Sequence, residues 1–312
     1  MTHAGAGFVL GFGFVLGSGF VSESHSVSGQ QLWQWRQAAK QQAQMGGVPL
    51  TEVDWLLQAV AGLDRLSLRL DLFRDRAEIL LPCSLEALTY LWQQRLEDRV
   101  PVQYLVGTTP WRKFQLAVSP AVLIPRPETE CLIDLAMNVV QQHPELAAGD
   151  WADLGTGSGA IAIGLAEALP QATIHAVDAS PDALAIAQTN AQQLGWGDRI
   201  QFYQGNWFAP LSLLQGKLKG MVSNPPYIPT AMLVDLQPEV AKHEPHQALD
   251  GGADGLDCIR HLVTTAPLYL GTGGVWMIEM MAGQANTVAE LLHQQGCYQN
   301  IQIHPDLAGI DR

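Results

Sequence analysis

Residues 153–160 read DLGTGSGA, and they lie between two apolar runs, WADL and AIAIGLAEAL. The first run is typical of a buried strand and the second of a helix. Gly155, Gly157 and Gly159 allow the backbone between the two runs to turn tightly and to approach a ligand closely. In an open α/β sheet, ligands bind at the carboxyl ends of the strands. The loop therefore predicts a ligand site at this strand end.

An acidic residue stands where a nucleoside would need one. Asp178 ends the next apolar run, TIHAVD, about 20 residues beyond the loop, where an acid accepts hydrogen bonds from ribose hydroxyls. Gly155, Gly157 and Ala160 also satisfy the G-x-G-x-x-G/A dinucleotide fingerprint. We expect a nucleoside-containing ligand here, in preference to a glycine turn with a solvated aspartate. These residues alone do not distinguish NAD from S-adenosylmethionine.

Strand-like and helix-like runs alternate along the rest of this half of the chain. A helix is predicted to begin at Ser180-Pro181-Asp182, because a serine cap, a first-turn proline and an acid favour a helix start. RIQFYQG, GMVS and GVWMIEM read as further strands. The alternation predicts an α/β fold, a doubly wound Rossmann-like sheet.

The first half of the chain has a different pattern. Residues 1–30 read as a disordered or atypical extension, in which an apolar, glycine-rich run lacks the positive start of a secretory signal and precedes a polar linker from Ser22 to Gln30. Residues 31–100 carry apolar side chains at three- and four-residue steps, which predicts a small helical bundle. Residues 101–120, with VQYLVG and FQLAVS, read as a β-hairpin linker to the main domain at 121–312.

The composition limits the classes of partner. The 312 residues include 17 Lys and Arg against 30 Asp and Glu, a net charge of −13, which argues against a broad nucleic-acid surface. The four cysteines are far apart in sequence and read as free thiols in a reducing cytoplasm. His243 and His246 flank a proline that spoils a helical metal face, so no metal is predicted. We expect a cytoplasmic monomer without a membrane segment.

The run GMVS ends in a stiff turn, Asn224-Pro225-Pro226-Tyr227. An amide nitrogen attacks a sulfonium methyl poorly, because its lone pair is delocalised, so a site must hold both of its N–H bonds and aim it. The side-chain oxygen of Asn224 and the backbone carbonyl of Pro225 supply two acceptors, and the prolines keep them rigid. The ring of Tyr227 can cover the planar group and favour positive charge that develops there. The alternative is a rigid turn without chemistry.

Three further stretches carry a resemblance to a known family. With the glycine loop and NPPY, the chain resembles the amino and amide methyltransferases that use S-adenosylmethionine. PVQYLVG, VLIPRPETE (Val122 to Glu130) and EPHQALDGGADGLD (Glu244 to Asp257) resemble the glutamine methyltransferases of peptide chain release factors. The resemblance begins at about residue 35 and includes the helical part. It implies methylation of the side-chain amide of the glutamine in the Gly-Gly-Gln motif of class 1 release factors.

The resemblance also implies roles for particular residues. The S-adenosylmethionine site would comprise the loop, the acid, an adenine-side aromatic and the turn: Gly155, Thr156, Gly157, Ser158, Gly159, Asp178, Trp207 and Asn224. The substrate glutamine would be bound by Asn224, Pro225, Pro226, Tyr227 and Arg126, with Asn224, Pro225 and Tyr227 catalytic. Pro127 and Glu128 would shape the pocket beside Arg126, for which a plain salt bridge is the alternative. Glu279 is expected to be structural, and the helical bundle to dock the substrate.

The chain departs from the family pattern in three places. Asn206 stands where the family often has an acid before the aromatic residue, which puts the adenine contact in doubt. The N-terminal extension is not typical. The sequence stops at DLAGIDR, where we expect one more strand to pair with IQIHP.

Other functions remain open at this point. A DNA adenine methyltransferase would use the same chemistry but needs a basic groove and usually a target-recognition insertion. A non-catalytic scaffold that binds the cofactor in translation termination would tolerate loss of Asn224. A nicotinamide oxidoreductase would need a catalytic acid that the NPPY strand end does not supply. The residues do not say which release factors serve as substrates.

Overall fold

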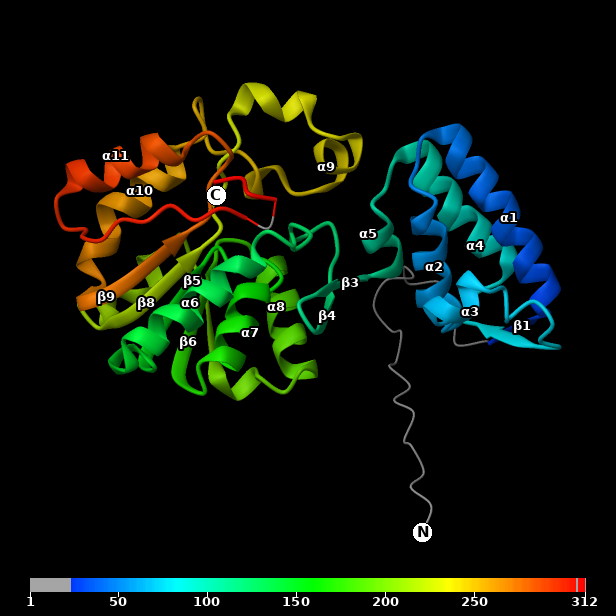
Figure 1. The fold of residues 1–312 in the computed structure, drawn as a ribbon, viewed down its shortest axis with the longest axis horizontal. Helices are drawn as coiled ribbons and strands as arrows, with labels where there is room; N and C mark the ends of the chain where they lie inside the picture. Colours follow the sequence, from blue (N-terminus) through cyan, green and yellow to red (C-terminus); the bar gives the residue numbers. More distant parts are fainter. Residues whose placement is uncertain (1–23, 307, 312) are drawn as a thin grey trace, which may run out of the picture. The chain divides into compact units, whose positions relative to one another are not determined.

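The computed structural model describes residues 24–306 and 308–311. The chain divides into two compact units, with the boundary between Gly107 and Thr108. Each unit has its own hydrophobic core. Figure 1 shows the helices and strands of both units.

The first unit is mainly helical. Its elements in chain order are β1 (His25–Val27), α1 (Gly29–Gly46), α2 (Thr51–Ala61), α3 (Arg65–Arg69), β2 (Ile79–Leu81), α4 (Leu85–Gln93) and α5 (Val102–Val106), with a π-helical turn at Gln94–Asp98. Leu32, Leu56 and Leu88, from three different helices, are completely buried in its core. Such burial supplies most of the stability of short helices.

The segment 24–30 corrects the prediction of an extension and polar linker that reach to residue 30. β1 pairs antiparallel with β2, and α1 begins at Gly29 rather than after residue 30. The side chain of Ser28 accepts from the backbone N–H of Gln31, whose side chain accepts from the Ser28 N–H in return. This capping box satisfies two donors at the helix start and explains the early boundary. Residues 1–23 of the predicted extension lie outside the described residues.

The prediction of a strand at VQYLVG is wrong. Val102–Val106 forms helix α5, with Pro101 just before it and Gly107 just after it at φ 74°. Proline before a helix and a left-handed glycine after it are helix boundary signals. The hairpin begins only at Thr108, with β3 (Thr108–Trp111) paired antiparallel to β4 (Phe114–Ala117).

The second unit is a doubly wound α/β domain, which confirms the predicted fold class. Its parallel sheet has the strand order β7-β6-β5-β8-β9. The strands are β5 (Ala148–Leu154), β6 (Gln171–Asp178), β7 (Ile200–Gln204), β8 (Leu218–Ser223) and β9 (Leu270–Ile278). The helices are α6 (Glu130–Gln142), α7 (Ala160–Ala168), α8 (Pro181–Gln193), α9 (Pro238–His243), α10 (Asp257–Thr265) and α11 (Ala285–Gln295).

Alternate residues of the central strands pack into two different cores, as the pleat of a strand requires. Trp151 and Ile174 pack with side chains of α6 and α7 on one face. Ala152 and Val177 pack with Leu262 of α10 on the other face. Figure 1 shows α6 and α7 on one side of the sheet and α10 with α11 on the other. Burial on both faces explains the apolar strand sequences.

The end of the chain differs from the sequence prediction as well. Residues 301–304 are not a strand, although IQIHP was expected to be one. Within the described residues, Pro305 forms an isolated bridge with Asp311, whereas residues 301–304 lack a ladder partner. Without that partner the backbone has no reason to extend as a strand.

No helix among residues 24–306 and 308–311 is both long enough and apolar enough to cross a bilayer.

The close approach of Gly220 to the Trp151 ring allows the packing between β8 and β5 to be tested. An added Cβ at Gly220 would lie 2.4 Å from the Trp151 ring, which is fully buried and donates from Nε1 to Leu146 O at 2.9 Å. We predict that Gly220→Ala lowers the free energy of unfolding by about 1–3 kcal/mol, since the held ring cannot move away. Gly197→Ala is the matched control, because its Cβ would approach nothing closer than the exposed Gln192 side chain, at 3.3 Å. Chemical unfolding of both variants measures the difference, and equal stabilities would contradict the prediction.

Candidate active site

Five strand ends meet at one edge of the sheet. β5 and β6 are in register at Leu154 and Val177, and β8 and β9 at Ser223 and Ile278. Because the strands are parallel, the segments that follow them lie side by side in the order of the strands. Along the edge this order is Trp207 after β7, Asp178 at the end of β6, the glycine loop after β5, Asn224 after β8 and Glu279 after β9.

The glycine loop has the backbone that its sequence predicts. Gly155, Gly157 and Gly159 have φ of 81°, 54° and 83°, in the left-handed region that favours glycine. The N–H groups of Gly155 and Thr156 both donate to Val177 O at 2.9 Å, which ties the loop to β6. A Cβ on Gly157 would meet no atom within 4 Å. The loop therefore has an open side from which a ligand can approach its backbone.

Asp178 lies beside this loop, as predicted. Its carboxylate accepts from the Gly157 N–H at 2.8 Å and from the Ser180 N–H at 2.9 Å. Ser180 in turn caps α8 through its hydroxyl, at 3.2 Å from the Ala183 nitrogen. A carboxylate has about four acceptor positions, so these two bonds leave capacity for further donors.

Trp207 also lies next to the loop, on the same side as Asp178 in the order of the strands. Its ring would be 3.4 Å from a Cβ added to Gly155, and its own φ is 50°. The structure thus brings together Trp207, Asp178 and the loop, all predicted as cofactor contacts. Ser158 is buried, and its backbone carbonyl accepts from Asn190 Nδ2 at 2.8 Å.

Asp153 is a buried acid that the sequence analysis did not single out. It is completely buried, and its Oδ2 accepts from the Thr156 hydroxyl at 2.6 Å and from the Ala162 N–H at 3.0 Å. It therefore satisfies a free N–H in the first turn of α7 and holds the loop from below. The Thr156 hydroxyl points inward for the same reason. Oδ1 of Asp153 is buried without a hydrogen-bond partner among the described residues.

Burial raises the pKa of Asp153 to about 7, since its charged form loses hydration there. This value of about 7 is the net result, in which the bonds from Thr156 and Ala162 lower the pKa and the nearby charge of Asp178 adds to the rise. An acid in such an environment is common at functional sites. Its position near the end of β5, two residues before Gly155, was the sequence signal that could have identified it.

The NPPY turn begins next to the glycine loop. The Ser223 hydroxyl donates to Leu154 O at 2.7 Å, which ties the last residue of β8 to the last residue of β5. Asn224 and Tyr227 are half-buried, and Pro225 between them is buried. Asn224 Nδ2 donates to Thr129 Oγ1 at 3.1 Å, and the Tyr227 hydroxyl donates to Glu279 Oε1 at 3.0 Å.

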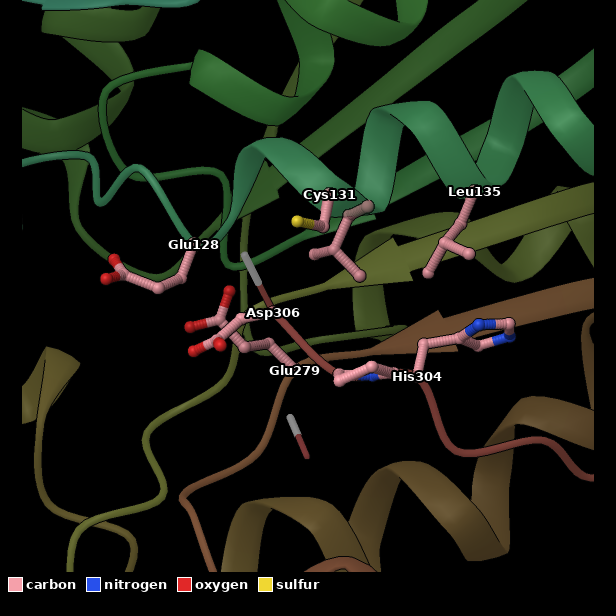
Figure 2. A pocket seen from close by; sticks show the side chains of 8 residues that line it. Glu128, Cys131, Leu135, Glu279, His304 and Asp306 are labelled. Atoms are coloured by element: carbon pink, nitrogen blue, oxygen red, sulfur yellow. The ribbon is translucent and has the colours of Figure 1, made fainter. Parts of the chain in front are cut away.

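A small pocket adjoins Glu279. Figure 2 shows Cys131 and Leu135 entering it from α6, with the carboxyl groups of Glu279 and Asp306 close to each other. Its remaining lining residues are Glu128, Leu132, His304 and Pro305. Burial, together with the acids around it, raises the pKa of the Cys131 thiol, which disfavours the reactive thiolate.

Of the predicted pocket residues, Glu128 lines this pocket, whereas Arg126 makes an ion pair. Arg126 Nη2 is 2.7 Å from Oε1 of Glu244, whose side chain is 1% exposed. The other Glu244 oxygen accepts from the Ile124 N–H at 3.3 Å. The two stretches VLIPRPETE and EPHQALDGGADGLD are thus joined through Glu244. Pro127 is exposed.

The described residues offer no metal-binding group. No cluster of three or more His, Cys, Asp or Glu side chains in residues 24–306 and 308–311 is placed to hold a metal ion.

The buried carboxyl of Asp153 makes stability depend on pH. Its pKa is about 7 in the folded chain, against an ordinary 3.8. The folded state therefore binds a proton that the unfolded state has lost, so stability falls as pH rises towards 7. We predict that wild type loses about 2 kcal/mol more than Asp153→Asn between pH 5.5 and pH 8, at 1.36 kcal/mol per pKa unit. Urea unfolding at the two pH values measures this, and equal losses in both proteins would refute it.

Comparison with known proteins extends these observations. The family model described as "Methyltransferase small domain" matches residues 132–239. In fold, the crystal structure of the hMettl16 catalytic domain in complex with the MAT2A 3′UTR hairpin 6 is similar, with a TM-score of 0.51 at 14% identity over 73% of this chain and 78% of that one. At this identity the likeness shows the fold alone.

Curated relatives match almost the whole chain. "Release factor glutamine methyltransferase" of Synechocystis sp. is 53% identical over 92% of this chain and 96% of that protein. The protein of the same name from Gloeobacter violaceus is 45% identical over 89% of this chain and 94% of its own length. The chain belongs to the release factor glutamine methyltransferase family.

Proposed function

We propose that this protein transfers a methyl group from S-adenosylmethionine to the side-chain amide nitrogen of the glutamine in the Gly-Gly-Gln motif of class 1 release factors. The names of the relatives support the reaction and its substrate. The observation that carries the proposal is the bond from Ser223 Oγ to Leu154 O at 2.7 Å. It places the NPPY turn directly beside the glycine loop, where a bound methyl donor and an amide would meet.

The residues of the edge fit S-adenosylmethionine. The space over Gly157 is open, Asp178 keeps acceptor capacity for ribose hydroxyls, and Asp153 Oδ1 is an acceptor without a partner among the described residues. When bound, this group supplies an electrophilic methyl on a positively charged sulfur. We propose that the cofactor is held by the loop and its neighbours, namely Gly155, Thr156, Gly157, Ser158, Gly159, Asp178, Trp207 and Asn224. Thr156 contributes its backbone, since its hydroxyl is used by Asp153.

The NPPY turn would bind and aim the substrate amide. Its N–H bonds are accepted by Asn224 Oδ1 and by the carbonyl of Pro225, which is rigid because proline restricts the backbone. The ring of Tyr227 covers the planar amide, with Pro226 beside it, and its face favours the positive charge that grows on nitrogen. The methylated nitrogen then loses a proton readily, so no dedicated base is required. Arg126 shapes the substrate side of the site through its ion pair with Glu244.

The rest of the chain would serve this reaction. We propose that the helical unit docks the release factor, and that the protein acts as a cytoplasmic monomer without stable nucleic-acid or membrane contacts. The net charge of −13 supports the absence of a nucleic-acid surface. No observation favours DNA as the methyl acceptor.

The reaction can be tested with labelled S-adenosylmethionine. We predict transfer of label to a folded class 1 release factor, and none to its Gly-Gly-Ala variant or to duplex DNA. Asn224→Ala should lower kcat by about 10²–10³-fold, because one fixed acceptor for the reacting amide is lost. Its affinity for the cofactor, measured by calorimetry, should change much less.

The other outcomes have distinct meanings. Label on DNA would move the assignment to an adenine methyltransferase. Cofactor binding without label on any acceptor would indicate a binding protein rather than an enzyme, and full activity of Asn224→Ala would exclude the assigned role of the turn.

Asp178 offers a separate test of the cofactor site. In Asp178→Asn, only one oxygen remains for the Gly157 and Ser180 N–H groups, so one donor loses its acceptor. We predict that the variant binds S-adenosylhomocysteine about tenfold more weakly, because the loop that binds the ligand loses a hydrogen bond that contributes about 1.4 kcal/mol. Asp182→Asn, at an exposed acid in the first turn of α8, is the control and should bind normally. Calorimetric titration gives both affinities, and a change of less than twofold in Asp178→Asn would contradict the prediction.

A further inference from the structure

We infer that Thr129 and Glu279 are positioning residues that set the orientation of the two functional side chains of the NPPY turn, Asn224 and Tyr227. This inference rests on the proposed function for its kinetic consequences. Its structural part, the orientation of the Asn224 carboxamide, can be tested without any substrate.

The prolines of the turn leave one freedom uncontrolled. They restrict the backbone around Pro225 and Pro226, but the last torsion of the Asn224 side chain is broad and roughly two-fold. The two orientations of a carboxamide differ in which of oxygen and NH2 faces the substrate. They occupy almost the same volume, so packing distinguishes them poorly. A hydrogen-bond partner with a fixed donor or acceptor role must therefore select one of them.

Thr129 is such a partner, because its hydroxyl hydrogen is already donated to another residue. Its Oγ1 is 2.7 Å from Glu279 Oε2 and 3.1 Å from Asn224 Nδ2. A hydroxyl has one hydrogen, and Thr129 donates it to Glu279 Oε2. Thr129 can then only accept from Asn224, which must turn its NH2 towards it. Asn224 Oδ1 is thereby left on the other side, where no described residue donates to it.

The same carboxylate also orients Tyr227. Glu279 Oε1 accepts from the Tyr227 hydroxyl at 3.0 Å, and the Glu279 backbone N–H donates to Ser223 O at 3.0 Å. Gln284 Nε2 donates to the Tyr227 carbonyl at 3.0 Å, so Tyr227 is held by both its ring hydroxyl and its backbone. One acid after β9 thus directs a side chain before α6 and two side chains after β8.

The exposed fractions of these residues indicate which of them can contact a substrate and which can only position others. Thr129 is 5% exposed and Glu279 is 3% exposed, whereas Asn224 and Tyr227 are half-buried. Figure 2 shows Glu279 at the pocket beneath α6, with Cys131 and Asp306 around it. A release-factor glutamine would meet the half-buried residues, and Thr129 and Glu279 would act through them.

The decisive experiment compares Thr129→Val with Thr129→Ser. Valine has nearly the shape of threonine without the hydroxyl, and serine keeps the hydroxyl without the methyl group. We expect Thr129→Val to lower kcat about 10–100-fold, as a misplaced reacting group does, with KM for the release factor and cofactor affinity within about twofold. Thr129→Ser should retain kcat within about threefold. A purely structural role would instead lower the melting temperature in both variants without separating their kcat values.

Coupling to Asn224 is tested by a double-mutant cycle. If Thr129 acts through Asn224, Thr129→Val should cost little further activity in the Asn224→Ala background, because the group that it positions is absent. Additive losses in kcat would overturn the inference. Glu279→Gln should also lower kcat by about tenfold, since a glutamine oxygen accepts from only one of the two hydroxyls.

Nuclear magnetic resonance gives a readout independent of methyl transfer. The side-chain amide signal of Asn224 is assigned by its loss in Asn224→Asp, and its hydrogen exchange is measured in the full-length protein. We expect slow exchange in wild type and Thr129→Ser, and at least tenfold faster exchange in Thr129→Val. If wild type fails to methylate the release factor, the proposed function fails, and the amide signal still decides the orientation. Equal exchange in all three proteins would overturn it.

Discussion

The pairing of β5 with β8 is the constraint on which the site depends. The two strands are parallel neighbours in register at Asp153 and Val222, and the Ser223 hydroxyl bonds to Leu154 O just beyond that pair. A shift of one residue would turn every side chain of β8 to the opposite face of the sheet. It would also withdraw the NPPY turn from the glycine loop. Two segments about 70 residues apart in sequence therefore share one edge only because this register is maintained.

Two buried acids support this edge from inside the domain. Asp153 holds the glycine loop to the start of α7, and Glu279 holds the NPPY side chains directly and through Thr129. Both acids are nearly or completely buried, so removal of a partner would leave a buried acceptor unsatisfied. The exposed parts of the site thus gain rigidity from bonds made beneath them, and the surface itself remains available to ligands.

Local sequence signals predicted the strands and the helix starts of the second unit well, but not every boundary or side-chain partner. Ser180-Pro181 and the loop glycines determine the conformation of only their own residues and a few neighbours. The helix start and the loop backbone could therefore be predicted from the sequence. VQYLVG was mistaken for a strand because a short apolar run has no clear period, and its flanking proline and glycine were underweighted. The bond of Asn224 to Thr129 spans 95 residues, and only the assembled sheet brings the two together.

The acids at the edge also suit the charge of the proposed reaction. Asp178 lies by the loop and Asp153 under it, and the pKa of Asp153 is raised to about 7. A positive group bound there would favour the ionised form of Asp153 and gain attraction from both carboxylates. Transfer of the methyl group would leave the sulfur uncharged, so this attraction would be weaker for the product. The two carboxylates beside and under the loop would therefore bind the charged donor more strongly than its product.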